Sequence, residues 1–131
     1  MLDSNVQSFL LQAASKALAT SSLDQVFNVV PVSSIRIKDG SIVLVNYFMD
    51  KTLANIQSNP YVALVAWSKM IGYQVKGTAA YYTGGELFDE IVQWVKDTIP
   101  DRTVRGIIVI TPTALYDIAP GKNTAEVFSK E

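Results

Sequence analysis

The segment from Ser41 to Pro60 constrains the fold most, because it carries a buried strand that runs directly into a short helix. Asp50 stands where a helix N-cap belongs, and Lys51 and Thr52 fill the first helical positions. A helix N-terminus offers free backbone N–H groups and a positive dipole end, both of which favour an anion. With the lysine ammonium and the threonine hydroxyl added, the segment has the groups of a phosphate-binding site. Lysine and threonine at an exposed helix start are also common in proteins that bind no ligand there.

Strand signals separated by short turns dominate the rest of the chain. Asp39-Gly40 lies between two β-rich runs, residues 35–38 and 41–45, and predicts a hairpin. Further strands are predicted over residues 16–22, 26–33, 61–67, 72–82 and 105–110, the last continuing over 113–118 beyond Pro112. Helices are predicted over residues 3–14, with Ser4 as cap, from residue 51 to the Asn59-Pro60 stop, and over 86–98.

Six or seven strands outnumber the three helices, so we expect a mainly β protein with flanking helices and antiparallel pairing. A closed or nearly closed barrel fits this pattern better than a doubly wound sheet. Pro31 removes a ladder donor and predicts an edge strand or a bulge, and Gly77 predicts a bulge or a close backbone approach. With 131 residues, we expect one domain over residues 1–131.

The chain contains no cysteine and no histidine, which excludes disulfides, thiolate catalysis and the Ser-His-Asp and Cys-His arrangements. The commonest metal ligands are absent too, and we expect no metal site. A net charge of −1 gives no electrostatic footprint for nucleic acid. No apolar run is long enough to span a bilayer, so we expect a cytoplasmic protein that does not bind membranes. If the protein is an enzyme, the absence of histidine and cysteine favours a reaction carried by a bound cofactor over one carried by side-chain acid–base chemistry.

Four motifs follow one another in a familiar order: residues 16–22, residues 28–33, residues 50–56 together with 59–64, and residues 72–79. Together they resemble the FMN-binding split-barrel proteins related to pyridoxamine 5'-phosphate oxidase, over about residues 11–120. The resemblance implies a six-stranded antiparallel split β-barrel and a homodimer with FMN bound at the interface. The chain is shorter than those oxidases and lacks their basic C-terminal segment, so their own reaction is not expected.

The resemblance also implies roles for individual residues, all of them in binding, and it assigns no catalytic residue. One strand should run along the flavin, a strand end should lie under the ribityl chain and ring edge, a helix start should hold the phosphate, and one polar residue should reach the ring from the other subunit. The residues implied along the flavin are Val30, Pro31, Val32, Ser33 and Ser34, and those implied under the ribityl chain and ring edge are Asn46, Tyr47 and Phe48. Lys51 and Thr52 are implied at the phosphate, and Gln74, with Tyr73 as a second candidate, is implied to reach the ring.

Simpler interpretations exist for some of these residues. Ser33 and Ser34 could form only a turn at a strand end, and Asn46 could simply satisfy a loop. Many relatives carry a basic residue near the flavin strand, and Arg36 is the nearest candidate here. If Arg36 points away, Lys51 is the sole nearby cation.

We therefore expect an FMN-binding flavoprotein of oxidoreductase type that passes hydride or electrons between small molecules. The alternative is a non-catalytic binding or carrier protein for flavin, deazaflavin or haem, the last disfavoured because no histidine is present to ligate iron. A structural dimer that has lost its ligand is the third possibility. The sequence identifies neither the electron donor nor the acceptor.

Overall fold

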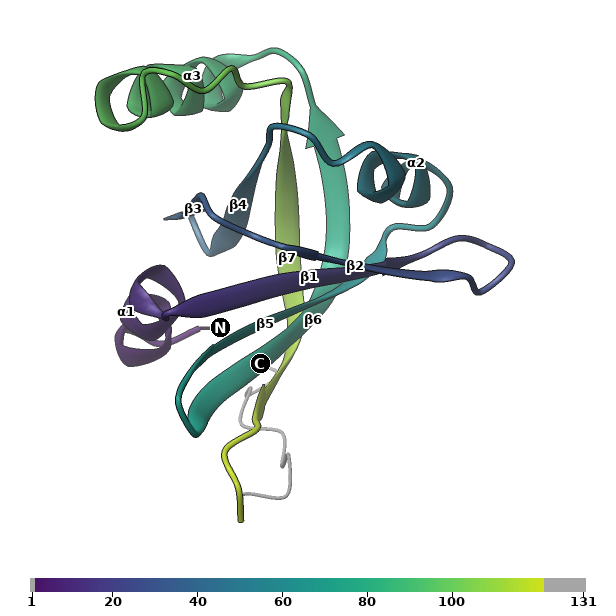
Figure 1. Ribbon diagram of the computed structural model, residues 1–131, viewed down its shortest axis with the longest axis vertical. Helices are drawn as coiled ribbons and strands as arrows, with labels where there is room; N and C mark the ends of the chain where they lie inside the picture. Colours follow the sequence, from purple (N-terminus) through teal and green to yellow (C-terminus); the bar gives the residue numbers. More distant parts are fainter. Residues whose placement is uncertain (1, 122–131) are drawn as a thin grey trace.

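The computed structural model describes residues 2–121, and within them seven strands form one antiparallel sheet with three helices around it (Figure 1). The strands are β1 (Ser15–Ser21), β2 (Phe27–Pro31), β3 (Ile35–Lys38), β4 (Ser41–Asn46), β5 (Tyr61–Ser68), β6 (Ile71–Tyr82) and β7 (Gly106–Asp117). The helices are α1 (Ser4–Gln12), α2 (Asp50–Ser58) and α3 (Glu86–Thr98). The expected mainly β class and antiparallel pairing are confirmed, with seven strands instead of six.

Two long strands, β6 and β7, join the two halves of a split barrel. The strand order is β2-β1-β5-β6-β7-β4-β3. β5 pairs with residues 71–78 of β6, and β4 pairs with residues 106–110 of β7. Figure 1 shows β6 and β7 running through both halves, with β1, β2 and β5 crossing them at one end and β3 and β4 beside them at the other. The segment between β2 and β3 therefore passes from one half to the other.

The two backbone irregularities expected from the sequence are both present. Pro31 ends β2, which is an edge strand, so its missing N–H interrupts no central ladder. A bulge falls between Lys76 and Gly77, where β6 faces Pro112 of β7. A Cβ atom on Gly77 would collide with the Thr111 carbonyl oxygen, so only glycine allows β7 to come this close.

Strand β4 is apolar from Ile42 to Val45 because both of its faces are covered. Ile42 and Leu44 lie in the main core inside the barrel, where α1 and α2 also contribute buried residues. Val43 and Val45 point the other way, into a second core that includes Ile91 of α3. This second core packs α3 against the outside of β4 and β7 and so positions the α3–β7 loop.

Two of the three helix starts, those of α1 and α2, differ from the sequence prediction by one residue. Asp3 caps α1, since its Oδ1 accepts a hydrogen bond from the Val6 N–H at 2.9 Å, so the assignment of Ser4 as cap is wrong. Asp50 is the first residue of α2 and Met49 is the N-cap, so the assignment of Asp50 as cap is also wrong. No helix within residues 2–121 has the length and apolar character needed to cross a membrane.

We expect Gly77→Ala to destabilise the fold by about 1–3 kcal/mol, because the added methyl group must displace the backbone of β7. Urea denaturation at matched protein concentration measures this loss. Gly84→Ala is the control, since a Cβ atom at Gly84 meets nothing within 4 Å, and its effect should stay within about 0.5 kcal/mol. Equal stability of the two variants would contradict the close approach at the bulge.

Candidate functional site

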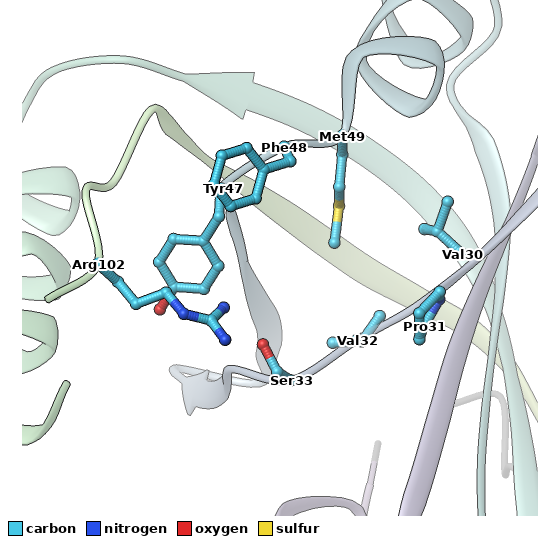
Figure 2. Close-up of a pocket in the computed structure, with 8 residues that line it drawn as sticks. All are labelled: Val30, Pro31, Val32, Ser33, Tyr47, Phe48, Met49 and Arg102. Atoms are coloured by element: carbon cyan, nitrogen blue, oxygen red, sulfur yellow. The ribbon is translucent and has the colours of Figure 1, made fainter.

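A pocket of about 420 Å³ opens where the two halves of the barrel meet (Figure 2). Three segments far apart in the sequence form its walls: the end of β2 with the residues after it, the corner between β4 and α2, and the loop between α3 and β7. The lining residues are Val30, Pro31, Val32, Ser33, Tyr47, Phe48, Met49 and Arg102. The walls are thus largely apolar, with a hydroxyl, a phenol and a guanidinium as the polar groups, which is the usual composition of a small-molecule site.

The first wall is held to the sheet on both sides of Ser33. The Val32 N–H donates to the Lys16 carbonyl at 3.0 Å, and the Val45 N–H donates to the Ser34 carbonyl at 3.3 Å. The Ser34 hydroxyl is buried and lies 2.8 Å from the Tyr47 hydroxyl, which joins the first wall to the second. Ser33 alone of the two serines lines the pocket.

Asn46 fixes the corner between β4 and α2. Its side chain is fully buried, its Nδ2 donates to the Tyr81 hydroxyl at 2.8 Å, and its Oδ1 accepts from the Met49 N–H at 2.6 Å. Gly106 leaves room for the Tyr81 ring, because a Cβ atom there would overlap it. Asn46 therefore orients Tyr47, Phe48 and Met49 without itself lining the pocket.

The start of α2 follows directly from this corner, and its positive dipole end is not capped by a side chain. The first intrahelical hydrogen bond runs from the Leu53 N–H to the Met49 carbonyl at 3.0 Å. The Lys51 side chain is exposed, whereas Thr52 is fully buried and its hydroxyl accepts from Asn28 Nδ2 at 3.2 Å. The one carboxylate in the first turn, Asp50, is paired with Arg105 at 2.7 Å.

The structure brings only part of the predicted set together. Val30, Pro31, Val32, Ser33, Tyr47 and Phe48 line the pocket; Ser34, Asn46, Lys51, Thr52 and Gln74 do not. Ser34, Asn46, Lys51 and Thr52 lie behind the walls or on the adjoining helix, as described above. Gln74 is half-buried on β6, opposite Val65 and Tyr116, in a part of the sheet outside this pocket.

Arg102 and Met49 are the pocket residues that the sequence did not reveal. The Arg102 guanidinium lies over the Tyr47 ring, 4.8 Å from the ring centroid. The basic residue considered instead, Arg36, lies over the Trp94 ring at 4.9 Å and does not line the pocket. No local sequence signal marks Arg102, because its position depends on how α3 packs against β4 and β7.

Comparison with known proteins agrees with the observed fold. The family model for pyridoxamine 5'-phosphate oxidase matches residues 2–119. An uncharacterized protein of Methanocaldococcus jannaschii is 37% identical over 118 residues, which cover 87% of this chain and 79% of that protein. HupZ of Group A Streptococcus superposes with a TM-score of 0.83 at 18% identity and covers 95% of this chain and 100% of its own.

Other solved structures share the fold but differ in the ligand that their descriptions name. An FMN-binding protein from Syntrophomonas wolfei has a TM-score of 0.77 at 20% identity and covers 87% of this chain and 84% of its own. An F420 reductase has a TM-score of 0.67 at 18% identity and covers 87% of this chain and 98% of its own. The haem storage protein HutZ of Vibrio cholerae has a TM-score of 0.70 at 13% identity and covers 88% of this chain and 94% of its own. Sequence identities of 20% or less to these three structures show a shared fold alone. With its family model matched over residues 2–119, the chain belongs to the pyridoxamine 5'-phosphate oxidase family of FMN-binding split-barrel proteins.

Proposed function

We propose that this protein is a homodimeric flavoprotein that binds FMN in the pocket between the barrel halves and passes hydride or electrons through it. The observation that carries the proposal is the junction of two unlike environments at Met49. An apolar pocket ends at this residue, and an uncapped helix bearing Lys51 begins after it. FMN is a ligand with the same two parts, a flat ring system and a phosphate.

The pocket residues fit the ring system. Val30, Pro31 and Val32 supply an apolar wall, and Tyr47 with Met49 supplies the facing one. A volume of about 420 Å³ lies within the range of ligand pockets. Backbone groups beyond Pro31, where the β2 ladder ends, and the Ser33 hydroxyl can bond the polar edge of the ring or the ribityl chain.

The start of α2 fits the phosphate. Its free N–H groups and the dipole favour an anion, and Lys51 adds a full charge. The ion pair of Asp50 with Arg105 offsets the carboxylate that would otherwise oppose a phosphate there. Thr52 would contribute its backbone N–H, because its hydroxyl is buried and faces Asn28.

A bound flavin supplies the hydride or electron transfer, and the protein binds it, orients it and limits the access of water. Tyr47 and Arg102 are the titratable residues among those that line the pocket. The Tyr47 hydroxyl is already hydrogen-bonded to the Ser34 hydroxyl, and a guanidinium has donors but no acceptor atom, so neither is suited to act as a general base. These residues therefore favour binding and electrostatic roles.

A carrier that holds a flavin or deazaflavin without turnover is the second candidate, and it is favoured because no general base lies among the lining residues that belong to the described part of the chain. Reduction of the bound flavin by NADH or NADPH, followed by absorbance, separates the two. Rapid reduction supports the oxidoreductase. A flavin that binds but is not reduced by either donor, although dithionite reduces it, supports the carrier.

The exposed face of β2, β1 and β5 supports a homodimer. Phe27, Val29 and Tyr61 have 78%, 65% and 71% of their surface exposed in the protomer. The register places Val29 opposite Ala19, and Ala19 opposite Ala63, so an apolar strip crosses the three strands. Patches of this kind mark protein interfaces. Gln74 lies on β6 next to this strip, opposite Val65, which is where a residue that reaches a second subunit should be.

We expect Lys51→Ala to raise the Kd for FMN by about tenfold or more, because one charge-assisted contact to the phosphate is lost. The Kd for riboflavin, which has no phosphate, should change by less than about twofold. Quenching of flavin fluorescence measures both constants. Lys96→Ala is the matched control, since this exposed lysine lies in the last turn of α3. Equal weakening of FMN and riboflavin would place the phosphate elsewhere.

We expect multi-angle light scattering to give twice the 14.4 kDa chain mass at micromolar concentration. Val29→Glu should shift the protein toward the monomer, because it places a charge in the apolar strip. Met70→Glu changes an equally exposed residue in the β5–β6 turn and should leave the mass unchanged. A monomeric wild-type protein would contradict the dimer.

A further inference from the structure

Asn28 ties an edge strand to the helix that begins beside the pocket. Strand β2 lies at the end of the sheet and pairs with β1 alone. Its side chains alternate, so that Asn28 and Val30 are half-buried on the inner face while the residues between and beside them are exposed. On that inner face the Asn28 Nδ2 donates to the Thr52 hydroxyl at 3.2 Å, which joins β2 to the first turn of α2.

This hydrogen bond connects the two parts of the proposed flavin site. Val30, on the same face of β2 as Asn28, lines the pocket. Thr52 lies at the start of α2, where the phosphate is proposed to bind. The bond between Asn28 and Thr52 therefore fixes how far the apolar wall lies from the helix start. FMN has to reach both of them at once, whereas riboflavin, which has no phosphate, needs only the pocket.

The backbone of the first turn shows why the orientation of Thr52 matters. The N–H groups of Lys51 and Thr52 have no acceptor within residues 2–121, whereas the next one, that of Leu53, donates to the Met49 carbonyl at 3.0 Å. The Thr52 side chain is fully buried, and its hydroxyl is held by Asn28. The two free N–H groups are thus oriented by a side-chain contact on the opposite side of the helix backbone from solvent.

We propose that Asn28 is a positioning residue for FMN. It holds Thr52, and with it the free N–H groups of α2, at the distance from the pocket that a phosphate-bearing flavin requires. The inference rests on the proposed function, and it assigns to Asn28 no contact with the flavin itself. The preference for FMN over riboflavin then depends on a residue that does not line the pocket.

A second hydrogen bond of the same kind supplies a matched control. The Asn55 Nδ2 donates to the Thr20 hydroxyl at 3.0 Å, so an amide and a hydroxyl also tie α2 to β1. This bond lies one turn further along the helix, beyond the free N–H groups. Its loss should weaken the anchoring of α2 without changing the separation between the pocket wall and the helix start.

Titrations with FMN and riboflavin, followed by flavin fluorescence, test the role of Asn28. We expect Asn28→Ala to raise the Kd for FMN by about fivefold or more and the Kd for riboflavin by less than about twofold. Asn55→Ala should change both constants by equal factors. In the flavin-free protein, hydrogen exchange of the Leu53 N–H should be faster in Asn28→Ala than in Asn55→Ala, because the first turn is no longer held.

Variants of Thr52 test whether Asn28 acts through this residue. Thr52→Val removes the acceptor and keeps the branched shape, so it should reproduce the loss of FMN preference, and it decides the matter if Asn28→Ala does not fold. Thr52→Ser keeps the hydroxyl and should bind FMN within about twofold of the wild type. The double variant of Asn28→Ala and Thr52→Val should bind FMN no more weakly than the weaker single variant, because both changes remove one bond.

Three results would overturn the role of Asn28: equal weakening of FMN and riboflavin by Asn28→Ala, additive losses in the double variant, and a loss of FMN preference in Asn55→Ala as large as that in Asn28→Ala. The proposed function is judged separately, from the wild type and Lys51→Ala. If Lys51→Ala loses the preference for FMN while Asn28→Ala and Thr52→Val keep it, this inference alone fails. A wild-type protein that binds no flavin overturns both.

Discussion

The buried side chain of Asn46 is the contact on which the site depends. It joins the Tyr81 hydroxyl to the Met49 N–H, so one amide ties the end of β4 to β6 and to the start of α2. A buried amide left without partners would cost about 1–3 kcal/mol, which makes the corner a well-determined conformation. Because the corner is fixed, Tyr47 and Met49 face the pocket while the α2 N-terminus stays uncapped.

The second organising constraint is the burial of β4 on both faces. Its inner residues complete the barrel core, and its outer residues bind α3. The packing of α3 returns the chain toward the pocket at Arg102, before β7 begins. The pocket therefore combines three segments that the sheet topology and a helix outside the barrel bring together.

The sequence predicted features that depend on local chemistry. Pro31 at a sheet edge, Gly77 at a bulge and the hairpin at Asp39-Gly40 each follow from what one or two residues can do to the backbone. Features that depend on distant partners were missed. The position of Arg102 requires the docking of α3, and the role of Asn46 requires Tyr81, which is 35 residues away. The cap of α2 was misplaced because Asp50 pairs with Arg105 and does not bond the helix N-terminus.

A crystal structure of the protein grown with FMN tests the central claim most directly, because it locates the phosphate and the ring in one measurement. The account predicts the phosphate at the α2 N-terminus beside Lys51, with the ring between residues 30–33 and Tyr47. A phosphate bound by Arg102, or a flavin bound outside this pocket, would contradict it.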